Sequence, residues 1–174
     1  MDSIMETVAK MMALSARTAP KAVGADFVEI KILSGKEIEE LAAEMIRYSR
    51  EEGKHNYDRD GENVRRSGAV LLLSLSDSEP IWQDCGACGF NSCREMKEKL
   101  GDGTEFAGPV CSWRLIDLGI ALGSAVKTAS LFNVDNRIMY RIGVSARRLG
   151  LIKGEIVVGV PLSATGKNIY FDRK

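Results

Sequence analysis

The sequence contains one histidine, no excess of either charge and no long uninterrupted apolar run. Its 24 basic residues balance 24 acidic residues, which argues against a protein that binds nucleic acid or an anionic membrane surface. A membrane-spanning helix needs roughly 20 consecutive apolar residues, and Asp117 and Lys127 interrupt the best candidate. The opening Met1-Asp2-Ser3 does not resemble a signal peptide. We therefore expect a cytoplasmic protein without a membrane span.

The scarcity of histidine limits the candidates for acid–base catalysis. The single copy, His55, lies in the charged run 50–61, which is rich in turn-forming residues and is predicted to be a loop. A lone histidine in a polar loop is more often solvated than catalytic, and no neighbour in the sequence orients this one. The sequence therefore identifies no catalytic residue.

Length and composition indicate one globular unit. With 174 residues, 45% of them hydrophobic, the chain can form one ordinary core. There is no internal repeat and no low-complexity segment. We predict a single domain over residues 1–174, in which residues 78–114 are an embedded segment that carries every cysteine.

Cysteine is also rare, but its copies are concentrated in one part of the chain. They follow the pattern C-x2-C-x4-C-x17-C and are Cys85, Cys88, Cys93 and Cys111. A 4Fe-4S cluster needs four thiolates that approach from different directions, so the backbone must wrap closely around it. Glycine permits such close wrapping, and Gly86 and Gly89 flank the first ligands. The pattern therefore favours a 4Fe-4S cluster with these four cysteines as its metal ligands.

Three other interpretations of the cysteines compete with a cluster. A structural zinc site usually has two close cysteine pairs, whereas the second half of this pattern has a single cysteine. Disulfides are disfavoured by a reducing cytosol. A thioredoxin-like C-x-x-C site requires a strand–helix context that is missing here, and it does not explain the other two cysteines. The spacing favours a cluster over zinc, and a zinc-stabilised interaction module is the non-redox alternative.

The cysteine segment resembles a known cluster-binding domain. The run from Trp82 to Cys93 and the later Pro109-Val110-Cys111 are similar to the small 4Fe-4S domain of electron-transfer proteins. Examples of such proteins are the ferredoxin-like subunit of Rnf complexes and the corrinoid iron–sulfur proteins. The resemblance implies an iron–sulfur protein that transfers electrons to or from a redox partner protein, which the sequence does not identify.

Hydrophobic periodicity predicts an α+β protein. The helical period occurs over residues 1–16, 34–49, 94–100, 115–132 and 135–149. Strand patterns cover residues 26–32, 69–75 and 154–161. Ser34 and Glu37 have the spacing of a capping box at the start of the second helix. In helix 115–132 we expect the small residues Gly119, Gly123 and Ala125 to form one face that admits a second helix closely.

The order of these elements resembles the flavin-dependent nitroreductase fold. Three runs carry the resemblance: Ala-Arg-Thr-Ala-Pro at 16–20, Ile-Asp-Leu-Gly at 116–119 and Val-Val-Gly-Val-Pro at 157–161. It implies a nitroreductase-like sheet flanked by helices, with the cysteine-rich 4Fe-4S loop as an insertion. It also implies a homodimer with FMN at the interface, as an alternative function. The FMN phosphate contacts that it implies are Arg17, Lys167 and Arg173.

Over its whole length the chain resembles a family of prokaryotic proteins described only as containing a ferredoxin-type domain. That resemblance includes the run 161–168 and implies no particular activity. The tail from Thr165 to Lys174 contains three large apolar residues, so we expect it to pack on the body or to cross to a partner. Three hypotheses result: an iron–sulfur electron carrier, an FMN-dependent nitroreductase-like oxidoreductase, and a zinc-stabilised interaction module.

Overall fold

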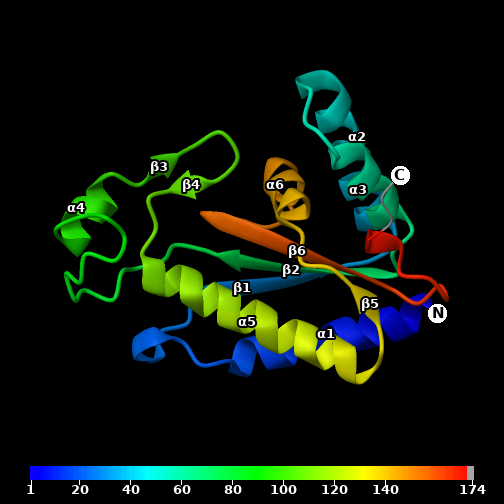
Figure 1. Ribbon diagram of the computed structural model, residues 1–174, viewed down its shortest axis with the longest axis horizontal. Coiled ribbons are helices and arrows are strands. Elements are labelled where there is room, and N and C mark those ends of the chain that lie inside the picture. Colours follow the sequence, from blue (N-terminus) through cyan, green and yellow to red (C-terminus); the bar gives the residue numbers. More distant parts are fainter. Residues whose placement is uncertain (172–174) are drawn as a thin grey trace.

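A four-stranded antiparallel sheet forms the centre of the protein in a computed structural model that describes residues 1–171 (Figure 1). The strands lie in the order β1, β2, β6 and β5. Their bounds are Val28–Leu33 for β1, Ala69–Leu75 for β2, Asp135–Asn136 for β5 and Ile156–Ser163 for β6. The three longer strands start and end within two residues of the predicted ranges, and the fourth is a short edge strand.

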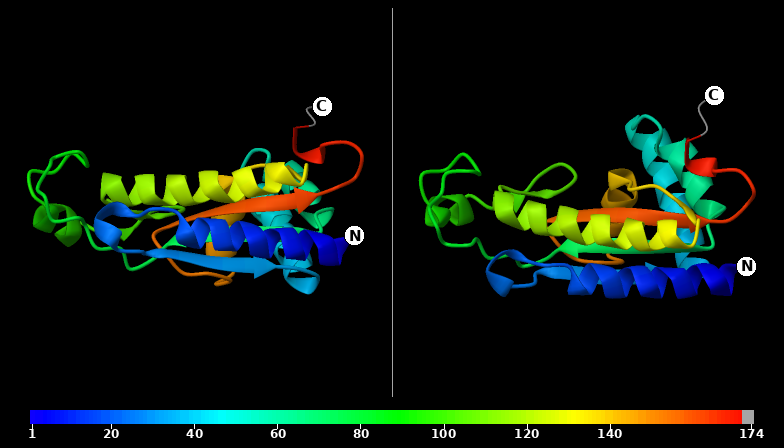
Figure 2. Two further views of the ribbon diagram at one scale, coloured as in Figure 1. Left: turned by 90° about the horizontal axis from the view of Figure 1, so that it is seen from below. Right: turned by 60° about the horizontal axis from the view of Figure 1, so that its bottom comes forward.

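Two helical layers cover the sheet, one on each face (Figure 2). The first layer consists of α1 (Asp2–Thr18) and α5 (Ser112–Leu131), which pack side by side. The second consists of α2 (Lys36–Glu52), α3 (Tyr57–Arg65) and α6 (Tyr140–Arg148). The sheet therefore lies between two hydrophobic cores.

Strand β2 is buried between these two layers, which explains its unbroken apolar sequence. All seven of its residues are buried. Successive side chains of a strand point to opposite faces. Leu71 and Leu73 accordingly lie in the core with α1 and α5, whereas Val70 and Leu72 lie in the core with α2, α3 and α6. The apolar run was correctly predicted to be a buried strand.

Two expectations about α2 and α3 were wrong. The capping box at Ser34 and Glu37 does not form, because the N-cap of α2 is Gly35 and no side chain caps it. The run 50–61, predicted to be a loop, contains the end of α2 and the first half of α3. There the buried Asp60 pairs with Arg141 of α6 at 2.7 Å. Such pairing allows a charged sequence to form a packed helix.

Helix α5 presents its small residues to two different sides. An added Cβ at Gly119 or Gly123 would meet no other atom within 4 Å, whereas Ala125 is fully buried in the core. The expectation that these three residues share one face was therefore wrong for Ala125, because the helical spacing places it over the sheet. No helix in the described residues, α5 included, is long and apolar enough to cross a membrane.

The part of the C-terminal tail that the structure describes packs on the body, which is one of the two outcomes expected from the sequence. A short 3-10 helix, η2 (Ile169–Phe171), buries Ile169 and Tyr170. The Tyr170 hydroxyl lies 2.8 Å from the Ser67 hydroxyl, and Arg137 donates to the Tyr170 carbonyl at 2.9 Å. The tail thus covers apolar surface beside α3.

The cysteine-rich segment lies at one end of the molecule, beyond the end of β2 (Figure 1). It contains α4 (Cys93–Glu98) and the small hairpin formed by β3 (Gly101–Asp102) and β4 (Ala107–Gly108). It returns to the body at α5, which begins one residue after Cys111. The segment is therefore an insertion between a central strand and the longest helix.

Candidate metal centre

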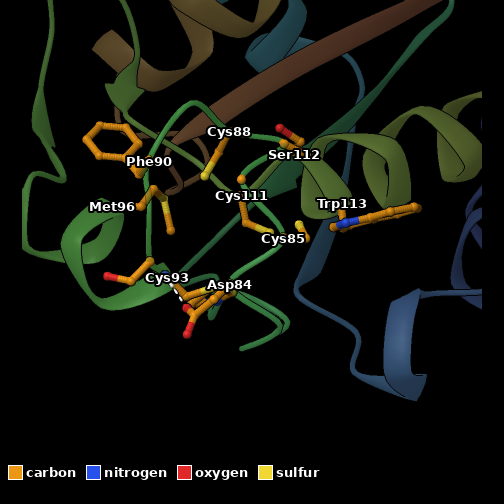
Figure 3. Close-up of a pocket in the computed structure, with 13 residues that line it drawn as sticks. Asp84, Cys85, Cys88, Phe90, Cys93, Met96, Cys111, Ser112 and Trp113 are labelled. Carbon is orange, nitrogen blue, oxygen red and sulfur yellow. Dashed lines mark hydrogen bonds between the residues drawn. The ribbon is translucent and has the colours of Figure 1, made fainter.

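The four cysteines line one cavity at the end of the molecule (Figure 3). Cys85 and Cys88 belong to the loop before α4, Cys93 is the first residue of α4, and Cys111 is the N-cap of α5. None is in a disulfide; Cys85 is exposed, Cys88 is half-buried and the other two are buried. The remaining large side chains of the wall are Phe90, Met96 and Trp113. The fold therefore brings together the four residues that the sequence selected.

The backbone of the loop 84–93 turns around this cavity. Gly86 and Gly89 have φ angles of 72° and 87°, a left-handed conformation that favours glycine. The Gly89 N–H donates to the Gly86 carbonyl at 2.9 Å, which closes a tight turn. The Asp84 carboxylate accepts a hydrogen bond from the N–H of Cys93 at 2.7 Å and so joins the two ends of the loop. These bonds hold the first three cysteines around one space.

Helix α4 begins at Cys93 because Ser92 caps it. The Ser92 hydroxyl accepts from the N–H of Glu95 at 3.1 Å, and the Glu95 carboxylate accepts from the N–H of Asn91 at 3.3 Å. This arrangement is a variant of the capping box. A helix was predicted over residues 94–100, and the Ser-x-x-Glu signal at 92–95 could have placed its start at Cys93.

The surroundings of Cys85 and Cys111 contain groups that attract negative charge. The pKa of Cys85 lies below its ordinary value because the N–H of Ala87 and, next in effect, the indole of Trp113 donate to its sulfur. Cys111 lies at the N-terminal end of α5, where the helix dipole is positive. Metals bind the thiolate form of cysteine, so both features suit a metal ligand.

The donor set fits a 4Fe-4S cluster, but the cavity is small. Four cysteine thiols are the usual ligands of such a cluster. The cavity volume is about 10 Å³, close to the room for a single water molecule. Among residues 1–171, no three His, Cys, Asp or Glu side chains form a group that could hold a metal ion. Binding of a cluster would therefore require the cysteine side chains to rearrange toward one point.

A buried ion pair lies at the base of the cysteine-rich segment. Arg114 and Asp117, at i and i+3 on α5, are 2% and 4% exposed and their charged groups lie 3.0 Å apart. The pair explains how an acidic residue is accommodated in the apolar α5. In the sequence Asp117 had no evident partner, although the spacing of the two residues is that of a helical ion pair.

Of the residues expected to bind a flavin phosphate, Arg17 and Lys167 lie in different parts of the described chain (Figure 2). Arg17, near the end of α1, donates to the Asp26 carboxylate at 2.6 Å and to the Val28 carbonyl at 2.8 Å. The segment 164–168, which contains Lys167, lies near the start of α1 (Figure 2). Arg173 lies outside the described residues. A phosphate group that contacts both Arg17 and Lys167 would need two copies of the chain.

The fold and the site define an α+β protein with an inserted cysteine-rich segment, and sequence relatives place it in a family. A protein of Archaeoglobus fulgidus, named only "Uncharacterized protein", is 49% identical over 169 residues, which are 97% of this chain and 91% of the relative. The family model described as "Uncharacterized protein containing a ferredoxin domain (DUF2148)" matches residues 107–173. The chain belongs to this family. Of the four cysteines, the matched range contains Cys111.

Solved structures confirm the predicted nitroreductase-like fold. The FMN-dependent nitroreductase NfnB from Mycobacterium smegmatis, in complex with NADPH, has a TM-score of 0.62 over 95% of this chain and 81% of its own, at 10% identity. A nitroreductase with bound FMN from Desulfitobacterium hafniense has a TM-score of 0.58 over 92% and 78%, at 13% identity. A BluB-like flavoprotein from Clostridium difficile has a TM-score of 0.53 over 90% and 78%, at 12% identity. At such identities the similarity concerns the fold alone.

Proposed function

We propose that the protein is an iron–sulfur protein that binds a 4Fe-4S cluster through its four cysteines and transfers electrons. The observation that carries this proposal is that all the cysteines of the chain, Cys85, Cys88, Cys93 and Cys111, are free and line one cavity. They belong to a loop and to the starts of two helices, so they approach the cavity from different sides, as a cubane requires. The description of the family as ferredoxin-domain proteins supports the same function.

The other residues of the site would influence the reduction potential of such a cluster and its access to a partner. The N–H of Ala87 and the indole of Trp113 lower the pKa of the Cys85 thiol, and N–H groups near ligand sulfurs influence the reduction potential of a cluster. When bound, the cluster supplies one-electron transfer. Because Cys85 is the exposed ligand, we expect a redox partner to approach from its side of the cavity.

Anaerobic reconstitution with iron and sulfide tests this function. The wild-type protein is expected to become brown, with absorption at about 400 nm from cluster charge transfer. Each Cys→Ser variant should lose most of this absorption, because an alcohol is a poor cluster ligand. Ser112→Ala, which changes another residue of the cavity wall, should retain it. A colourless protein with one zinc ion per chain would instead support the zinc-stabilised interaction module.

An FMN-dependent oxidoreductase is a second candidate function, favoured by the fold. The two nitroreductases named above are described with FMN and match at least 92% of this chain. A site formed by Arg17 and Lys167 would require a homodimer. Apolar side chains that a second copy could cover lie along α1 and α5, where Ile4, Leu14, Ile116 and Ile120 are all at least 40% exposed.

Sedimentation and flavin extraction test the second candidate together. We expect a dimer at micromolar concentration, and Ile120→Glu should convert it to a monomer because it places a charge among these apolar side chains. Leu149→Glu makes the same kind of change at an exposed residue after α6 and should leave the dimer intact. A monomeric wild-type protein would remove the shared FMN site. A dimer that yields no flavin would contradict the FMN-dependent function and leave the iron–sulfur function unaffected.

A further inference from the structure

The side chain of Arg114 joins three separate parts of the chain. It is 2% exposed, and its Nε donates to the Glu79 carbonyl at 2.7 Å. Its Nη1 lies 3.0 Å from the Ala22 carbonyl, 3.1 Å from the Ala25 carbonyl and 3.0 Å from the Asp117 carboxylate. A buried guanidinium with this many acceptors fixes the backbone around it.

One of these contacts, that with Glu79, closes the cysteine-rich segment at its base. Glu79 lies where the chain leaves the sheet, and Arg114 lies where it returns, 35 residues later. The N–H of Arg114 also donates to the Cys111 carbonyl at 3.0 Å. The bond from Arg114 to Glu79 therefore fixes the distance between the last cysteine and the loop that carries the first three.

The same residue holds a strained turn, η1 (Ala22–Gly24). Val23 has φ 52° and is 69% exposed; a left-handed conformation is uncommon for a β-branched residue. Asp117 accepts from the N–H of Ala22 at 2.7 Å, and Arg114 binds the carbonyls on both sides of the strained residue. Strained backbone persists where its surroundings over-determine it. The pair of Arg114 and Asp117 supplies that constraint.

We propose that Arg114 is the positioning residue of the four-cysteine site. Together with Asp117 it fixes Cys111 relative to the loop 84–93, and it locks the exposed turn at Val23 to the same base. Arg114 does not line the cavity, so it acts through the backbone. The guanidinium donates from two separate nitrogens held in one plane, Nε to Glu79 and Nη1 to Ala22 and Ala25, and the single nitrogen of a lysine lacks this fixed fork. This role rests on the proposed function only in treating the cavity as a metal site.

Three variants separate positioning from charge and from overall stability. Arg114→Met with Asp117→Asn removes both charges, so that no unpaired charge stays buried. Arg114→Lys keeps the charge beside Asp117 but lacks the planar fork. Arg94→Met is the matched control, because it removes one exposed positive charge from α4 close to the cavity.

The first measurement is the alkylation rate of each cysteine in the reduced, metal-free protein, with the unfolding equilibrium constant measured separately in urea. In the double variant, any loss of stability alone raises the alkylation rates of Cys111 and Cys93 in proportion to the unfolding constant. We expect the measured rates to exceed that increase by at least about tenfold, which corresponds to the loss of one hydrogen bond to a charged group. Arg114→Lys should show a smaller excess, and Arg94→Met should show none. Proteolysis within residues 20–26 should also become faster in the double variant.

Two results would overturn the positioning role. One is an alkylation rate that rises only in proportion to unfolding, which would make Arg114 an ordinary stabilising residue. The other is an equal excess in Arg94→Met, which would assign the effect to charge. Because this assay contains no metal, it tests the positioning role even if the wild-type protein fails to take up iron and sulfide. Such a failure would count against the proposed function alone.

Discussion

The four cysteines differ in how far solvent reaches their sulfurs, which predicts an order of reactivity. In the reduced, metal-free protein we expect iodoacetamide to modify Cys85 and Cys88 at least about tenfold faster than Cys93 and Cys111, because the latter pair reacts only after local opening. The lowered pKa of Cys85 increases its thiolate fraction at any pH below its ordinary value, so Cys85 should react first. Peptide mass spectrometry over time measures each rate. Equal rates at Cys85 and Cys93 would contradict the described burial.

At the level of single residues, the sequence predicted what depends on local spacing and missed what depends on distant contacts. Four cysteines in a cluster-like pattern could be selected without a structure, and all four line one cavity. Arg114 could not be assigned its contacts, because Glu79 and Ala22 lie 35 and 92 residues away along the chain. The pairing of Asp117 with Arg114 could have been predicted from their i, i+3 spacing, but the three carbonyls around Arg114 could not.

Among the elements, α6 packs so closely on β6 that its glycine cannot be enlarged. An added Cβ at Gly143 would overlap the carbonyl group of Val157. Gly143→Ala should therefore lower the free energy of unfolding by about 2 kcal/mol or more, as expected for overpacking against backbone. Gly101→Ala, at a position open to solvent, should change it by less than about 0.5 kcal/mol. Urea unfolding measures both, and similar midpoints for the two variants would show that α6 can shift away from the strand.

Elements with a strong apolar pattern were predicted well, and elements stabilised by charge were not. Strand β2 was located correctly because both of its faces are buried, which leaves an unbroken apolar run. Helix α3 was missed because its sequence, Tyr57–Arg65, is mostly polar. Its buried Asp60 depends on Arg141 from α6, a contact between residues 81 positions apart. Local periodicity contains no information about such a partner.

At the scale of the whole molecule, the body and the inserted cysteine-rich segment are distinct parts. The body has the nitroreductase-like fold of proteins described with FMN, while the insertion carries all the cysteines at one end of the molecule (Figure 1). Helix α5, which begins directly after Cys111 and runs along the sheet, connects the two. In the proposed function the insertion performs the electron transfer, and the body holds it in place through α5.

The content of iron, acid-labile sulfide and zinc in protein reconstituted anaerobically tests this account most directly. We predict about four irons and four sulfides per chain and little zinc, with both values falling sharply in Cys111→Ser, which removes the ligand farthest along the chain from the others. One zinc per chain, without sulfide and unchanged by the iron treatment, would contradict the account.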